Sequence, residues 1–260
     1  SDVTDITRGI EALARDSQIE DDKAGNKRGG KALKLSHVNG EISDEAGSAL
    51  ILMACDTEKN PFLNAAKLLR RLSDLRRIEA TGEVDNFENV SPGAKRIAKL
   101  ILRCMAQNPD DVKIDDLRPL SEIGKTVQLR ARPELIAQHF QLIGYSKGGN
   151  VVSDAMRYLI NDLTAADTSG KTLVRMNGNG ATQDNVRDLV RNIACMSIAA
   201  LEVPMDEHYK HHGVRRVSFN NEFDLISNHM DFESTWADHK WKITGVKQNQ
   251  GHDPKDALGT

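Results

Sequence analysis

Aromatic residues, cysteines and long apolar runs are all scarce in this chain of 260 residues. Aromatic side chains make up 4% of the sequence, which leaves few rings for stacking on nucleic-acid bases or on sugars. No run approaches the roughly 20 apolar residues that a membrane-spanning helix needs. The net charge of −3 gives no general attraction to nucleic acid or to a membrane surface. We therefore expect no nucleic-acid partner and no integral membrane segment.

The cysteine content and the first residues bear on the compartment. Cys55, Cys104 and Cys195 are odd in number and lie in apolar stretches, which favours buried free thiols in a reducing compartment over a disulfide framework. Residues 1–5 show no basic region followed by an apolar core, so no signal peptide is visible. The expected location is cytoplasmic, or outside the cell after export without a visible signal peptide, as for a bacterial effector.

Strand-like and helix-like segments alternate along most of the chain. Residues 1–30 are polar and charged and predict an arm, which is disordered in our interpretation. Residues 31–260 predict one α/β domain, a mostly parallel sheet with helices on both faces, and the polar stretch 164–185 predicts a small lid-like insertion. The predicted strands are 49–55, 112–117, 140–143, 193–201, 214–219 and 241–246, and the predicted helices are 61–78, one that opens at Ser91-Pro92, 133–139, 150–163 and 186–192.

One junction carries most of the chemical information. The apolar stretch 140–143 runs directly into Gly144-Tyr145-Ser146-Lys147-Gly148-Gly149, and a helical pattern follows. This is G-x-S-x-G between a strand and a helix, the context in which a sharp turn exposes a nucleophilic serine. A side chain at either flanking glycine would crowd so tight a turn, and positive φ is a second reason to expect glycine there. Ser146 is therefore the candidate nucleophile.

A nucleophilic serine needs a base, and the base needs an orienting acid. Asp224 follows the strand 214–219, and His252 follows the strand 241–246. The chain order is therefore Ser146, Asp224, His252. Glu222 and Asp231 compete with Asp224 for the role of the acid, and Asp224 is our choice. His229 and His239 compete for the role of the base, and His252 is preferred because it follows the last strand whereas they precede it. Asp253 is interpreted as a helix cap.

On these residues the chain resembles the α/β-hydrolase-fold serine hydrolases, a family that includes esterases, lipases and thioesterases. The resemblance implies hydrolysis of a small-molecule or acyl ester, or of a thioester, with Ser146 as nucleophile, His252 as base and Asp224 as orienter. It implies an oxyanion hole formed by the backbone N–H of Lys147 and a second donor from Cys55 or Asp56. The family commonly has His-Gly at that second position, where this chain has Ala54-Cys55. No metal or organic cofactor is expected.

Other interpretations stay open at this point. The main alternative is a catalytically silent hydrolase fold that acts as a binding or virulence-associated protein. A Rossmann nucleotide site is disfavoured because no G-x-G-x-x-G follows the first strand. The segment 207–212 contains three histidines but is interpreted as a solvated loop, and the basic run 67–77 as an exposed helix face. The oligomeric state is not indicated.

Overall fold

The structure is a computed structural model, and it describes residues 50–53, 61–145, 147–198, 216–221 and 239–243. Helices and strands alternate in these residues, so the protein has an α/β-type fold. Two sheets are present in the described part of the chain, one of five strands and one of three.

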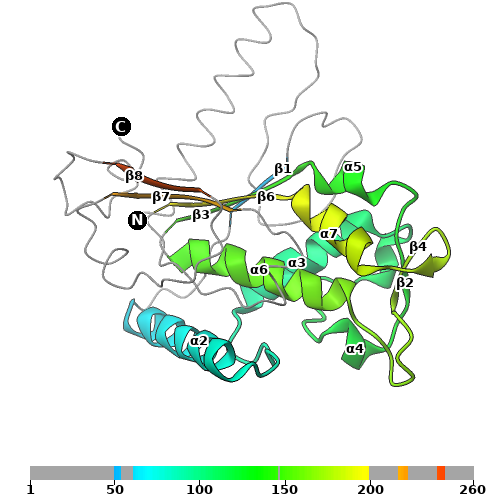
Figure 1. The fold of residues 1–260 in the computed structure, drawn as a ribbon, viewed down its shortest axis with the longest axis horizontal. Coiled ribbons are helices and arrows are strands. Elements are labelled where there is room, and N and C mark those ends of the chain that lie inside the picture. Colours follow the sequence, from blue (N-terminus) through cyan, green and yellow to red (C-terminus); the bar gives the residue numbers. More distant parts are fainter. Residues whose placement is uncertain (1–49, 54–60, 146, 199–215, 222–238, 244–260) are drawn as a thin grey trace, which may run out of the picture.

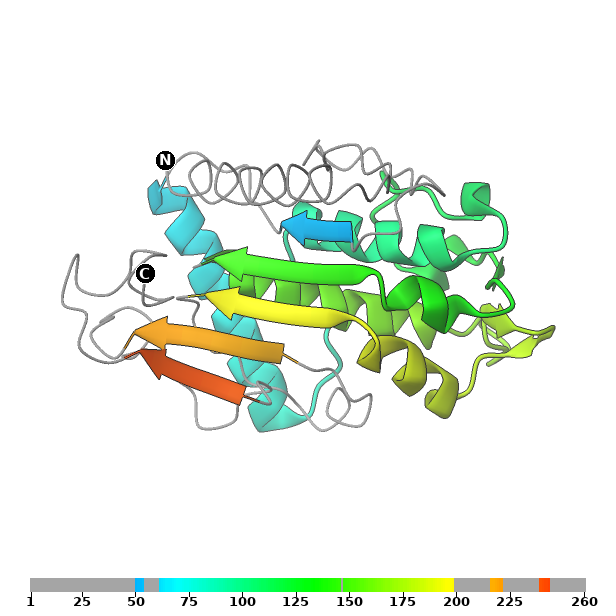
Figure 2. The same cartoon turned by 90° about the horizontal axis from the view of Figure 1, so that it is seen from above.

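The larger sheet contains five strands that are parallel throughout. They are β1 (Leu50–Met53), β3 (Phe140–Tyr145), β6 (Ala194–Ile198), β7 (Arg216–Asn221) and β8 (His239–Ile243). Their order across the sheet, β1-β3-β6-β7-β8, is also their order along the chain. All five arrows point the same way in Figure 2. We call the end to which they point the C-terminal end of the sheet.

Three long helices cover one face of this sheet: α2 (Pro61–Thr81), α3 (Pro92–Met105) and α6 (Lys147–Leu163) (Figure 1). Parallel crossovers are right-handed, so helices share a face when successive strands are added in the same direction. Because β3 and β6 are both added in the same direction from β1, the helices before each of them lie on the same side. We predicted helices on both faces, and the three longest described helices all cover one.

Helix α6 is the centre of the hydrophobic core. Every residue from Gly148 to Ile160 is buried, because the helix is enclosed between α3 and strands β3 and β6. Helix α3 presents an apolar face to it and is capped at its N-terminus, where the Ser91 side chain accepts a hydrogen bond from the Ala94 N–H at 3.2 Å. The predicted core positions of α3 are all buried: Ile97, Leu100, Ile101 and Met105.

A smaller, mixed sheet lies at the opposite end of the molecule, where the strands of the larger sheet begin (Figures 1 and 2). Strand β2 (Val127–Gln128) pairs in parallel with β4 (Val174–Met176), which pairs antiparallel with β5 (Asn179–Gly180). The β4–β5 turn is Asn177-Gly178, with φ of 50° and 81°, the left-handed pair that tight hairpins prefer.

Short helices connect these strands. They are η1 (Pro109–Asp111), α4 (Leu120–Ile123), α5 (Pro133–Ala137) and α7 (Gln183–Arg191). Helix α7 begins with a capping box, in which the Thr182 hydroxyl accepts from the Asn185 N–H and the Asn185 side chain accepts from the Thr182 N–H.

Two local predictions were wrong. Residues 112–117 form turns between η1 and α4 instead of a strand, because Asp115 and Asp116 interrupt the apolar run and Pro119 follows it. Helix α6 begins at Lys147, three residues before the predicted start, so Gly148 and Gly149 are helical.

The lid-like stretch 164–185 contains β4 and β5 and lies at the end of the sheet where the strands begin, away from the C-terminal end.

Candidate functional site

A single residue separates β3 from α6 in the chain. Strand β3 ends at Tyr145 and α6 begins at Lys147, so Ser146 alone separates a parallel strand from a buried helix. Ser146 itself lies outside the described residues. The strand and the helix that were predicted on either side of the G-x-S-x-G motif are confirmed.

Gly144 is confined by the helix that follows it. A Cβ atom built on Gly144 would lie 2.2 Å from the carbonyl oxygen of Gly148, 2.3 Å from its carbonyl carbon and 2.5 Å from the backbone nitrogen of Gly149. These distances are far below van der Waals contact, and the opposing atoms belong to backbone, which cannot rotate away. The expected crowding at this glycine is confirmed. Its φ is not positive, so the second expected reason for glycine does not apply to Gly144.

The C-terminal end of the sheet is where the remaining predicted site residues follow their strands. Asp224 is the third residue after the end of β7, and His252 is the ninth after the end of β8. Cys55 and Asp56 follow β1. All four lie outside the described residues, so their roles stay predictions. The sheet order brings the ends of β1, β3 and β6 to adjacent positions, with β7 and β8 beyond them.

The rival histidine His239 occupies a different position from the one we predicted. We expected it before the last strand, and it is instead the first residue of β8, paired in register with Val217. Through the register of the sheet, His239 is level with Ile143, two residues before the end of β3, and strands β6 and β7 lie between them. The choice of His252 over His239 as the partner of Ser146 therefore stays a prediction. The other rivals, His229, Glu222 and Asp231, lie outside the described residues.

Lys147 occupies the first position of α6 and is half-buried. Backbone N–H groups in the first turn of an α-helix have no acceptor within the helix, and the helix dipole makes this end positive. A backbone donor next to Ser146 therefore belongs to the part of a helix that is suited to stabilising an oxyanion.

A buried cluster of four charged groups connects α2 to α6, and sequence reasoning missed it. The Arg71 guanidinium donates to Asp154 through Nε at 3.0 Å and Nη2 at 2.9 Å, and to Asp85 through Nη1 at 3.0 Å and Nη2 at 2.6 Å. Arg157 Nε lies 3.6 Å from Asp85 Oδ2. The cluster holds two positive and two negative groups, all of them buried.

The electrostatics of this cluster follow from burial and from the close contacts. Burial by itself lowers the pKa of Arg71, but the carboxylates of Asp154 and Asp85 outweigh it, so the pKa lies above its usual value. Burial also raises the pKa of Asp85, yet the hydrogen bonds from Arg71 and from the Phe87 N–H bring it below the ordinary range. Arg71 and Asp85 are therefore held in their charged forms.

We had assigned Arg71 to an exposed basic face, and that prediction was wrong. The other basic residues of the run are exposed as predicted: Lys67, Arg70, Arg76 and Arg77. Arg71 lies three residues after Leu68 and four before Leu75, so it shares the inward face of α2 with them. That spacing was the signal in the sequence that Arg71 is buried, and a buried arginine requires a buried acid as partner.

A second buried ion pair lies at the far end of α6. Lys99 Nζ donates to Asp162 Oδ2 at 2.7 Å, each side chain is 1% exposed, and Asp162 Oδ1 accepts the Leu120 N–H at 2.8 Å. Burial outweighs the attraction of Lys99 and raises the pKa of Asp162. This pair joins α3, α4 and α6 about four turns away from the Ser146 turn.

Ser197 on β6 is a buried hydroxyl beside the Ser146 turn. It pairs in register with Gly144, is 0% exposed, and its Oγ has no hydrogen-bond partner in the described structure.

An unsatisfied buried hydroxyl costs stability, so we expect Ser197→Ala to raise the free energy of unfolding by about 1 kcal/mol in urea melts. The matched control is Ser153→Ala, which removes a buried hydroxyl that donates to the Gly149 carbonyl at 3.1 Å. This variant should lower the free energy of unfolding by about 1 kcal/mol. An equal loss in both variants would contradict the prediction.

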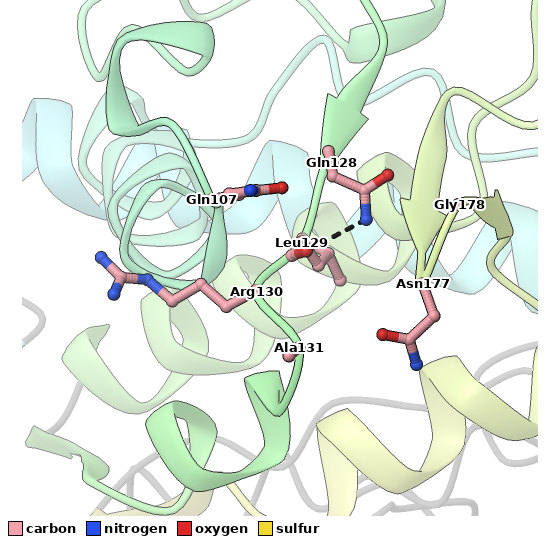
Figure 3. Close-up of a pocket in the computed structure, with 7 residues that line it drawn as sticks. All are labelled: Gln107, Gln128, Leu129, Arg130, Ala131, Asn177 and Gly178. Atoms are coloured by element: carbon pink, nitrogen blue, oxygen red, sulfur yellow. Dashed lines mark hydrogen bonds between the residues drawn. The ribbon is translucent and has the colours of Figure 1, made fainter.

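A cleft of about 470 Å³ lies beside the small sheet (Figure 3). Its lining residues are Gln107, Gln128, Leu129, Arg130, Ala131, Asn177 and Gly178. The Gln128 amide donates to the Leu129 carbonyl, and the Arg130 side chain extends away from Asn177. Among these described residues there is no hydroxyl, thiol, imidazole or carboxylate, so the cleft carries no catalytic set.

Neither a protein-family model nor a curated protein nor a solved structure matches this chain.

No helix in the described part of the chain has the length and apolar character that a membrane span requires. Cys104 and Cys195, both within the described residues, are buried as predicted, and burial raises the pKa of Cys104 to about 11. No group of three or more His, Cys, Asp or Glu residues in the described segments is arranged to hold a metal ion.

Proposed function

We propose that the protein is a serine hydrolase that cleaves an ester or thioester through an acyl-enzyme at Ser146. The proposal includes an α/β-hydrolase-like fold as the finer description of the α/β architecture. The observation that carries it is the contact between Gly144 and the first turn of α6. A glycine whose Cβ position is filled by the backbone of Gly148 and Gly149 is what a turn needs when it exposes a serine between a strand and a helix.

The bare motif would not carry this proposal, because glycine and serine are common residues. The added support is the parallel strand that ends one residue before Ser146 and the buried helix that begins one residue after it. The sequential order of β6, β7 and β8 beyond β3 agrees with an acid and a base supplied after later strands. In this arrangement all three groups follow the C-terminal ends of parallel strands, where α/β sheets carry their sites.

The proposed mechanism follows the general chemistry of activated serines. His252 accepts the proton of the Ser146 hydroxyl as its oxygen attacks the acyl carbon, and Asp224 orients the imidazole and stabilises its charged form. The Lys147 N–H and a donor from Cys55 or Asp56 stabilise the oxyanion of the tetrahedral intermediate. His252 then gives its proton to the leaving alcohol or thiol, and water releases the acyl group by the same steps. This chemistry uses no metal or organic cofactor.

Labelling with a fluorophosphonate tests the proposal directly, because this probe reacts with activated serines. We expect labelling of the wild-type chain at Ser146, identified by mass spectrometry of peptides, and hydrolysis of p-nitrophenyl acetate. Ser146→Ala should abolish labelling and lower kcat on the order of 10⁴- to 10⁶-fold. His252→Ala should do the same through loss of the base. Ser169→Ala, at an exposed turn of the described structure, is the matched control and should behave as wild type.

The same experiment distinguishes the alternative function. A folded wild-type chain that neither labels nor hydrolyses the ester would favour the catalytically silent binding protein. Labelling at a serine other than Ser146 would refute the site while keeping the class of enzyme. Comparison of an oxygen ester with a thioester of the same acyl group would then show which leaving group the site prefers.

A further inference from the structure

We propose that Arg71, Asp85 and Asp154 form a positioning cluster that fixes the start of α2 relative to the start of α6. Helix α2 follows the segment that contains Cys55 and Asp56, and α6 begins with Lys147, so the two helices adjoin the proposed oxyanion donors. The cluster would therefore set the spacing of those donors without touching the substrate. The inference rests on the proposed function, because it concerns the geometry of that same site.

The connection from cluster to site runs through two rigid helices. Helix α2 begins at Pro61, immediately after the segment that follows β1, and Arg71 lies ten residues further along, about 15 Å at the rise of an α-helix. Helix α6 begins at Lys147, directly after Ser146, and Asp154 lies seven residues further along, about 10 Å. A bond between Arg71 and Asp154 therefore joins the two helices close to the ends that reach the site.

The described side chains of α2 that precede Arg71 are mostly exposed. The described side chains between Leu63 and Arg70 are exposed except for the half-buried Leu68, and Leu63 and Leu69 are 46% and 54% exposed. Among the side chains of α2 whose burial is described, Arg71 is the first that is buried, and Leu72 is the first buried apolar one. The ion pairs of Arg71 therefore join α2 to α6 ahead of the buried apolar contacts described for α2.

The geometry of the bonds suits orientation better than it suits stability. The guanidinium engages each carboxylate through two nitrogens, and such a planar fork fixes direction as well as distance. Buried ion pairs, by contrast, are often no more stabilising than apolar residues of similar size. A cluster retained for positioning should therefore be replaceable without loss of stability, but not without loss of rate.

The double variant Arg71→Met/Asp154→Leu separates these two roles in the full chain. It removes one positive and one negative charge and leaves Asp85 with Arg157. We expect a melting temperature equal to that of wild type or higher. We also expect kcat for p-nitrophenyl acetate, per fluorophosphonate-labelled site, to fall at least about tenfold, with KM within about twofold, because small misplacements of catalytic groups act on the rate. A purely structural role would leave kcat per labelled site unchanged.

Two further variants complete the test. Arg71→Lys keeps the charge and loses the fork, so it should also lower kcat, and it decides the matter should the double variant fail to fold. Lys99→Met/Asp162→Asn neutralises the ion pair at the far end of α6 and should keep wild-type kcat. Wild-type kcat in both Arg71 variants, with Ser146→Ala inactive, would overturn the positioning role and leave the proposed function intact. No Ser146-dependent turnover in wild type would overturn both.

Discussion

Gly144→Ala should destabilise the protein by about 3 kcal/mol, the upper part of the usual range for an overpacked core, and should abolish fluorophosphonate labelling. The added methyl carbon would lie 2.2 Å from the Gly148 carbonyl oxygen. The opposing atoms belong to the backbone of Gly148 and Gly149 and cannot change rotamer, so β3 or the first turn of α6 must move. Movement there displaces Ser146, which lies between them in the chain.

The measurements are urea unfolding followed by circular dichroism and the rate of labelling at a temperature where the variant is folded. Gly82→Ala is the matched control, because Gly82 has φ of +69° and no atom within 4 Å of its Cβ position. That variant should lose about 1–2 kcal/mol from backbone strain alone and label at the wild-type rate. Wild-type stability and labelling in Gly144→Ala would contradict the close approach on which the proposed function rests.

Lys99→Met should cost about 3–5 kcal/mol in the free energy of unfolding, because it leaves the Asp162 carboxylate buried without its counter-ion. The double variant Lys99→Met/Asp162→Asn should recover most of that loss, since the amide oxygen still accepts the Leu120 N–H. Urea melts of the two single variants and the double variant form the thermodynamic cycle. A double variant as unstable as Lys99→Met would show that Lys99 acts through packing instead of charge.

The loss in Lys99→Met should depend on pH. Burial already raises the pKa of Asp162 in the folded protein, and removal of Lys99 raises it further. A carboxyl whose folded pKa exceeds its unfolded value of about 4 favours the folded state when protonated. The destabilisation should therefore be small near pH 4–5 and grow as the pH rises through the folded pKa of Asp162. The measurement is urea melts of variant and wild type across this range, and a pH-independent difference would contradict it.

The secondary structure was largely predictable from local patterns. The unbroken apolar stretch at 50–53 predicted β1, and the apolar spacing of Ile97, Leu100 and Ile101 after Ser91-Pro92 predicted α3. The strands of the small sheet, two or three residues long, were not predictable, because β2 pairs with β4 across more than forty residues and neither is long enough to show alternation. The polar stretch after α6 looked like a loop for the same reason.

The candidate site divides in the same way. The strand and the helix beside Ser146 were predictable because G-x-S-x-G and the two apolar patterns are all local, although α6 begins three residues earlier than predicted. The buried charges were not, because Arg71 reads as one more basic residue on a helix until Asp85 and Asp154 are known to face it. The order of strands across the sheet is likewise a tertiary fact, and it bears on which of His239 and His252 ends near Ser146.

The sheet order has a consequence for how the chain is made. Each strand of the larger sheet pairs with the one that precedes it in that sheet, so a chain that leaves the ribosome N-terminus first can extend the sheet outward as it emerges. The longest delay falls on β1, because Leu50 pairs with Phe140, ninety residues later. At a synthesis rate of ~5–20 residues per second, β1 waits about 5–20 s for its partner strand β3. The nascent chain should therefore depend on chaperones most during the synthesis of α2 to α5.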